Sequence, residues 1–184
     1  MASQKTGSDH APFGIEHGPG GASTRAYHAL IVDDEPGNLD MLRARLLRHG
    51  YEVSMAASAA EAEAVVSRRV PDIILLDIRM PDVTGLDYLR LLRGSPQTLR
   101  LPVIMVSGLG DTENIVTAIR GGANDYVTKP INLPVLLARM ETHLKMAALL
   151  MHLEAQTQIL GKLAALDHLT GVYNRRSLFD VLEV

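Results

Sequence analysis

Five polar side chains that could do chemistry each follow a short apolar run in the sequence. The clearest run is residues 73–76, four apolar residues that lead directly into a single aspartate. Such a run predicts a strand buried on both faces of a sheet. Its aspartate is then expected at the carboxyl end of the strand, where open α/β sheets place ligands. The five residues are Asp33, Asp34, Asp77, Ser107 and Lys129.

Three of these side chains are carboxylates, and converging carboxylates repel one another. Two unit charges about 4 Å apart cost about 4 kcal/mol at an effective dielectric constant near 20. The cluster therefore calls for a divalent cation, and its hard oxygen ligands favour Mg²⁺ over zinc. A carboxylate beside Mg²⁺ can attack phosphorus, with Lys129 supplying positive charge and Ser107 a hydroxyl. The alternative is that Asp77 only starts a turn before Pro81.

Short apolar strands alternate with amphipathic helices five times between Tyr27 and Pro130. This alternation predicts an α/β fold, a flavodoxin-like (βα)5 parallel sheet of strand order 2-1-3-4-5 with helices on both faces. In that order strands one, three, four and five lie side by side, with their carboxyl ends together. Leu39, Leu42, Leu46 and Leu47 recur at helical spacing, so the first helix is expected to run to about His49 and to stop at Gly50.

Composition excludes several classes of function. The 184-residue chain has a net charge of -3 and no basic stripe, so nucleic acid is not an expected partner. It has no cysteine, which excludes disulfides and thiolate sites and fits a cytoplasmic location. No apolar run is long enough to cross a bilayer, so no membrane association is expected. Residues 1–26 are rich in Gly, Ser, Pro and His, and we expect them to form a disordered tail.

Residues 133–166 have the composition of one long helix. They contain no proline after Pro134, one glycine (Gly161), and many helix-forming residues, which predicts a helix of roughly 50 Å. A first apolar stripe contains Leu137 and Met140, and a later stripe has coiled-coil spacing. We therefore expect a parallel homodimer through this helix; the alternatives are that it folds back on the sheet or is a disordered connector. The expected dimer seam is Leu144, Met151, Leu153, Leu160 and Leu163.

The motifs at the strand ends resemble those of receiver domains of two-component response regulators. They are Val32-Asp33-Asp34-Glu35, Leu76-Asp77-Ile78-Arg79-Met80-Pro81 with Gly85, Val106-Ser107, and Gly122-Ala123-Asn124-Asp125-Tyr126-Val127-Thr128-Lys129-Pro130. Each motif alone is weak, but together, in this order, they are specific. The resemblance places a receiver domain at residues 27–146.

The resemblance implies a role for each motif residue. Asp77 would be the phosphoacceptor, supplied by a partner histidine kinase. Mg²⁺ would be bound by Asp34 directly and by Asp33 as an outer ligand, with Asp77 and the backbone carbonyl of Arg79 completing the site. The phosphoryl-binding and switch residues would be Lys129, Ser107 and Tyr126, and the Lys129-Pro130 peptide bond would be cis.

The last residues resemble the opening signature of GGDEF diguanylate cyclase domains. The stretch is Leu166-Asp167-His168-Leu169-Thr170-Gly171-Val172-Tyr173-Asn174-Arg175-Arg176-Ser177-Leu178-Phe179, with Val172 where leucine is usual. We therefore expect residues 167–184 to be the incomplete start of such a domain. The catalytic core of that family is not in this sequence, so any cyclase activity would belong to a longer parent protein.

The sequence thus predicts a response regulator that is phosphorylated on Asp77 and signals through a dimeric coiled-coil helix to synthesis of cyclic di-GMP in the parent protein. An alternative is a stand-alone receiver that acts as a phosphate sink or a partner-binding module. A phosphoaspartate hydrolase is disfavoured, because Arg79 stands where a second catalytic aspartate would be needed.

Overall fold

The computed structural model describes residues 25–108 and 112–165, with side chains described as far as Thr157. The expected tail at residues 1–26 lies outside the described residues except for Arg25 and Ala26. The expected GGDEF segment at 167–184 lies wholly outside them. The chain divides into two compact units, Met1–Met140 and Glu141–Val184.

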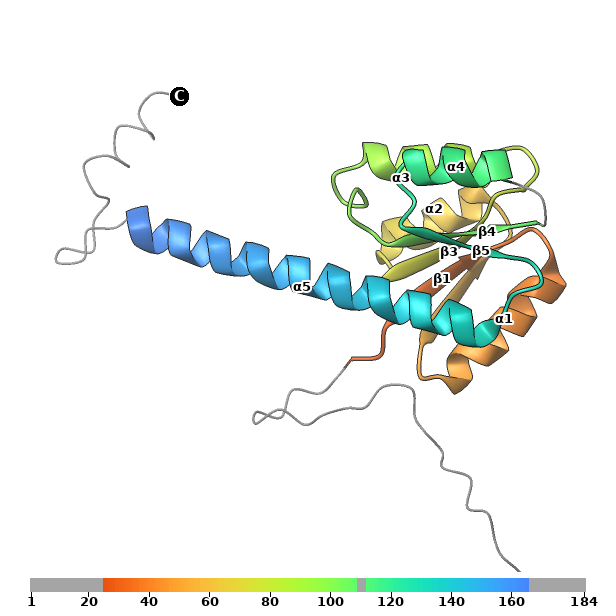
Figure 1. Ribbon diagram of the computed structural model, residues 1–184, viewed down its shortest axis with the longest axis horizontal. Helices are drawn as coiled ribbons and strands as arrows, with labels where there is room; N and C mark the ends of the chain where they lie inside the picture. Colours follow the sequence, from red (N-terminus) through yellow and green to blue (C-terminus); the bar gives the residue numbers. More distant parts are fainter. Residues whose placement is uncertain (1–24, 109–111, 166–184) are drawn as a thin grey trace, which may run out of the picture. The chain divides into compact units, whose positions relative to one another are not determined.

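The first unit is built on a five-stranded sheet of order β2-β1-β3-β4-β5, in which every strand pair is parallel (Figure 1). This confirms the predicted flavodoxin-like topology. Strands β1, β3 and β4 are buried along their whole length, as their unbroken apolar runs require. The strands are β1 His28–Val32, β2 Glu52–Ala56, β3 Ile73–Asp77, β4 Val103–Ser107 and β5 Asp125–Thr128.

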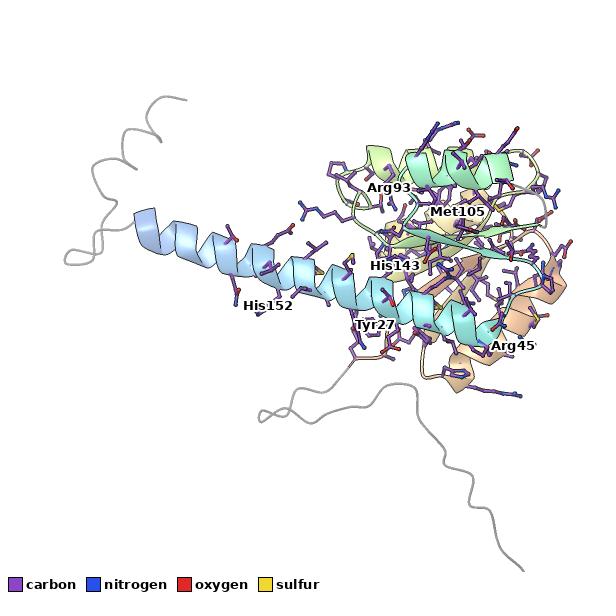
Figure 2. All side chains as sticks on the ribbon, in the orientation of Figure 1. Tyr27, Arg45, Arg93, Met105, His143 and His152 are labelled. Carbon is purple, nitrogen blue, oxygen red and sulfur yellow. The ribbon has the colours of Figure 1, made fainter. Side chains whose placement is uncertain are left out.

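Helices cover both faces of the sheet, with α2, α3 and α4 on one face and α1 and the start of α5 on the other (Figure 1). Alternate strand residues such as Leu30, Leu76 and Met105 pack toward α2, α3 and α4. Figure 2 shows the side chains that fill these layers, with Met105 labelled. The helices are α1 Pro36–Arg48, α2 Ala59–Arg68, α3 Gly85–Gly94, α4 Thr112–Arg120 and α5 Leu133–Ala165.

Local sequence signals set where these helices begin. Pro36 occupies the first turn of α1, where its missing N–H is not needed. The hydroxyls of Ser58 and Thr84 cap α2 and α3 by accepting the backbone N–H three residues later. Within α1, Leu39, Leu42 and Leu46 are buried, whereas Leu47 is 45% exposed. It adjoins the buried Leu46 but lies about 100° further round the helix.

The guanidinium of Arg93 fixes the turn that leads into β5. It donates hydrogen bonds to the carbonyl oxygens of Gly122 and Thr98 and to Oδ1 of Asn124. The same Oδ1 accepts the backbone N–H of Val103 at the start of β4. This network holds the end of α3 and the starts of β4 and β5 together, and so helps to place the residues at the far end of β5.

Helix α5, blue-green to blue in Figure 1, has 33 residues, about 50 Å at 1.5 Å per residue. Leu136 and Met140 are fully buried, so the first stripe begins at Leu136 and not at the predicted Leu137. Leu144 is 2% exposed and Met151 is 72% exposed. No helix in the described part of the chain has the length and apolar character needed to cross a membrane.

Candidate functional site

Four neighbouring strands deliver polar side chains to the carboxyl edge of the sheet. Asp33 follows the last residue of β1, Asp77 ends β3, Ser107 ends β4 and Lys129 follows β5. The register holds these ends level. Asp77 lies opposite Val106, and the backbone N–H of Lys129 donates to the carbonyl oxygen of Ser107 at 2.7 Å. The fold therefore brings the predicted residues to one place.

The three predicted carboxylates form one cluster. Asp33, Asp34 and Asp77 each offer an oxygen within 4.8 Å of the others. Asp33 is 2% and Asp77 5% exposed, whereas Asp34 lies at the surface. The Asp34 carboxylate makes no hydrogen bond to any residue that the structure describes, so its oxygens are available to a ligand.

Lys129 bridges the two buried carboxylates. Its Nζ lies 2.8 Å from Oδ2 of Asp33 and 2.5 Å from Oδ2 of Asp77. The other Asp77 oxygen, Oδ1, accepts the backbone N–H of Arg79 at 3.1 Å. Three carboxylates and one ammonium leave two negative charges uncompensated, so the site has both the charge and the hard oxygen donors to fit Mg²⁺. The ligand role predicted for the Arg79 carbonyl stays a prediction.

Burial and pairing act on these two groups in opposite senses. Burial raises the pKa of Asp77, although the hydrogen bonds from Lys129 and from the Arg79 backbone oppose this rise. Burial alone would lower the pKa of Lys129, but its bonds to Asp33 and Asp77 outweigh burial and raise that pKa. Lys129 is therefore held firmly in its charged form, while the buried charge on Asp77 is only partly compensated.

Asn38 is part of the site, although the sequence did not single it out. Its Nδ2 lies 3.0 Å from Oδ1 and 3.1 Å from Oδ2 of Asp33, and 2.8 Å from Oε2 of Glu35. The backbone N–H of Glu35 also donates to Oδ1 of Asp33 at 2.9 Å. Asn38 could have been predicted from its position, because it is an amide in the first turn of the helix that follows the acidic residues Asp33, Asp34 and Glu35.

The two predicted switch residues occupy different environments. The Ser107 side chain is fully buried, and its Oγ has no hydrogen-bond partner among the described residues. Such an orphaned hydroxyl at the edge of the cluster could bond an incoming oxygen. Tyr126 is half-buried on β5, packs against the core, and has the Arg139 guanidinium 5.9 Å from its ring centre. The Lys129-Pro130 bond is cis, as the resemblance implied.

Gly85 makes room for the backbone of Asp77. A Cβ on Gly85 would overlap the carbonyl oxygen of Asp77, and it would lie 2.9 Å from the carbonyl carbon of that residue. The N–H of Gly85 donates to the carbonyl oxygen of Ile78 at 3.0 Å. The start of α3 is thereby packed directly on the backbone that carries the aspartate, which explains why the motif needs a glycine here.

Comparisons with known proteins agree with this geometry. Residues 29–141 match the family described as "Response regulator receiver domain". The phosphate regulon transcriptional regulatory protein PhoB of Rhizobium meliloti is 38% identical over 117 residues, 64% of this chain and 52% of PhoB. The response regulator PleD of Caulobacter vibrioides is 38% identical over 113 residues, 61% of this chain and 25% of PleD. The chain thus spans about half or less of these relatives.

A solved structure supports the same relationship. The crystal structure of NtrX from Brucella abortus superposes with a TM-score of 0.67 and 33% sequence identity. The match covers 72% of this chain and 30% of that chain.

We expect Gly85→Ala to destabilise the first unit by about 1–3 kcal/mol, because the new methyl group must displace the backbone of Asp77. Gly94→Ala is the matched control, since a Cβ there meets nothing within 4 Å. That change should be neutral or stabilise by up to about 1 kcal/mol. Denaturant unfolding measures both free energies, and equal stability of the two variants would contradict the close packing.

We expect Asp77→Asn to raise the free energy of unfolding at pH 7 without Mg²⁺. Because the folded-state pKa of Asp77 is raised, its ionisation opposes folding. Protonated Asp77 therefore makes its full contribution to the free energy of unfolding below the ordinary carboxyl pKa. That contribution is lost as the pH rises through the pKa that Asp77 has in the folded protein. The difference in the free energy of unfolding between Asp77→Asn and wild type should shrink as the pH is lowered toward 3.8, the ordinary pKa of an aspartate carboxyl. Thermal unfolding from pH 3.5 to 7 checks this, and a gap that widens on acidification would contradict it.

Proposed function

Because the chain belongs to the response regulator receiver domain family, we propose that it is a phosphorylation-controlled switch whose phosphoacceptor is Asp77. The phosphoryl donor is a phosphohistidine on a partner histidine kinase. The observation that carries the proposal is the convergence of Asp33, Asp34 and Asp77 on the Lys129 ammonium, beside the orphaned hydroxyl of Ser107. Domain boundaries at residues 27–146 and 133–166 form part of the proposal.

The transfer step needs only groups that the site provides. A carboxylate oxygen of Asp77 attacks the phosphorus and forms the new P–O bond. The P–N bond to the donor imidazole breaks, and its electron pair stays on the imidazole nitrogen. Lys129 moves from the carboxylate to an oxygen of the transferred group, and the Ser107 hydroxyl donates to another. Burial of Asp77 keeps competing water away from most of the site.

The cluster would hold Mg²⁺ through Asp34 directly, with Asp77 beside it and Asp33 as an outer ligand. When bound, Mg²⁺ supplies the positive charge that the phosphoryl oxygens need as charge develops on them. Asp34 suits direct binding because its carboxylate has no hydrogen-bond partner among the described residues. Asp33 suits an outer role because hydrogen-bond donors already occupy its oxygens.

Phosphorylation shifts an equilibrium between two states of the receiver. The new phosphoryl oxygens accept a hydrogen bond from the buried Ser107 hydroxyl, which has no partner among the described residues, and this draws the end of β4 toward Asp77. Tyr126, on the neighbouring strand β5, then repacks in the space beside it. A reversal of the two populations from 1:99 to 99:1 needs about 5.5 kcal/mol, and several charge-assisted hydrogen bonds are enough to provide it.

Helix α5 carries the change to a second copy of the chain. Met146, Leu149, Leu150 and Leu153 recur at helical spacing and are 54%, 58%, 50% and 48% exposed, so they form a continuous apolar stripe. A parallel homodimer covers this stripe. Of the predicted seam, Leu153 lies on the stripe, whereas Met151 is exposed on the other side of the helix. Leu144 is already covered within one chain, and Leu160 and Leu163 lie beyond the side chains that the structure describes.

The output in the parent protein is synthesis of cyclic di-GMP by a diguanylate cyclase domain. The support is the GGDEF-like sequence at residues 166–179, which follows a receiver and a helix in the expected order. Receivers also serve other outputs, since the relative PhoB is named as a transcriptional regulatory protein. The sequence at 166–179, and not the receiver, is what supports this choice of output.

Acetyl phosphate with Mg²⁺ should add one phosphoryl group to the wild-type chain and none to Asp77→Asn. Asp82→Asn is the matched control. It removes a carboxylate five residues along the same loop, where φ is 65° and asparagine is well tolerated. Intact-protein mass spectrometry reads the result. An Asp77→Asn chain that still gains the group would contradict the assignment of the acceptor.

Beryllofluoride with Mg²⁺ should drive the wild-type chain into dimers, and the double substitution Leu149→Glu with Leu153→Glu should return it to monomers. Two buried charges cannot be accommodated in an apolar seam. Ala155→Glu is the control, an exposed position on the opposite side of the same helix. Sedimentation or light scattering measures the mass. A wild-type chain that stays monomeric with the mimic would favour the stand-alone receiver instead.

A further inference from the structure

The buried carboxylate of Asp33 accepts hydrogen bonds from three donors. A carboxylate has about four lone-pair positions. On Asp33, Oδ1 accepts from the Glu35 backbone and from Asn38, at 2.9 and 3.0 Å. Oδ2 accepts from Lys129 at 2.8 Å and is 3.1 Å from the same Asn38 nitrogen. With its side chain 2% exposed, Asp33 can give an oxygen directly to a cation only if one of these donors leaves.

Asn38 is held in place as a donor to two acids. One hydrogen of its Nδ2 is shared between the oxygens of Asp33, and the other faces Oε2 of Glu35 at 2.8 Å. Because these neighbours are carboxylates, which only accept, the NH₂ end of the amide must face them. The Asn38 backbone N–H donates to the carbonyl oxygen of Glu35 at 3.0 Å, so the first turn of α1 fixes its position.

The three donors to Asp33 differ in how easily they can give way. The Glu35 N–H belongs to the backbone and cannot turn away without moving the chain. Lys129 also serves Asp77, and the proposed transfer uses its charge. The Asn38 side chain, in contrast, can leave Asp33 by rotation about its own bonds. It is therefore the donor that a cation must displace to gain an oxygen of Asp33.

We propose that Asn38 is a positioning residue that competes with Mg²⁺ for Asp33 and so sets the metal affinity of the site. This inference rests on the function proposed above. The amide stabilises the metal-free cluster, because it supplies donors to two carboxylates that otherwise repel. It keeps Asp33 an outer ligand, leaves direct binding to Asp34, and thereby weakens the binding of Mg²⁺.

Titration calorimetry with Mg²⁺ alone tests the inference on the full chain. Asn38→Ala should bind Mg²⁺ about 3- to 10-fold more tightly than wild type, because the variant lacks one competing hydrogen bond of ordinary strength. The metal-free variant should also unfold at a lower temperature. Asp40→Ala, at an exposed position on the same helix, is the control and should leave the Mg²⁺ affinity within about twofold of wild type.

The opposite result separates competition from a merely structural role. If Asn38 only supports the fold, Asn38→Ala will lower the stability and also weaken or leave unchanged the Mg²⁺ affinity, which would overturn the inference. In an Asp33→Asn background the tightening should disappear, because the shared carboxylate is gone. A tightening that persists there would also overturn it. A wild-type chain that binds no Mg²⁺ would overturn the proposed function, and this inference with it.

Discussion

A single ammonium group placed between two buried carboxylates is the interaction on which the site depends. Lys129 contacts both Asp33 and Asp77, and a third acid, Asp34, lies within the same cluster. One positive charge cannot balance three negative ones, so the metal-free site stores electrostatic repulsion. A divalent cation would offset that repulsion. The metal-free cluster is therefore expected to lower the stability of the fold, as is common at functional sites.

The parallel sheet makes this arrangement possible. At the carboxyl edge the ends of four neighbouring strands meet, and each apolar strand brings a polar residue to the site. The backbone around Asp77 is held by the close approach of Gly85 and by the hydrogen bond from Ile78 to Val106. Arg93 anchors the turn before β5, in which Thr128 lies opposite Ser107 and Lys129 follows directly. Burial of the apolar core thus stabilises the fold and offsets the electrostatic repulsion among the polar residues at its edge.

Sequence patterns were enough to predict the strands and the residues at their ends, because an unbroken apolar run has one consistent interpretation in a parallel sheet. Side chains on helices were harder. Leu47 is exposed and Leu136, not Leu137, is buried, since neighbouring apolar residues compete for a face that only the docked helix decides. Asn38 was missed for a related reason. Its role depends on a side chain that turns back toward Asp33, and no spacing rule specifies that direction.

The central claim is that Asp77 receives the phosphoryl group, and chemical trapping of the acyl phosphate tests it most directly. After reaction with acetyl phosphate and Mg²⁺, borohydride reduces an aspartyl phosphate to homoserine, which peptide mass spectrometry can locate. The account predicts homoserine at position 77 and unmodified aspartate at positions 33 and 34. Homoserine at either of those neighbours, or at no position despite a gain in mass, would contradict it.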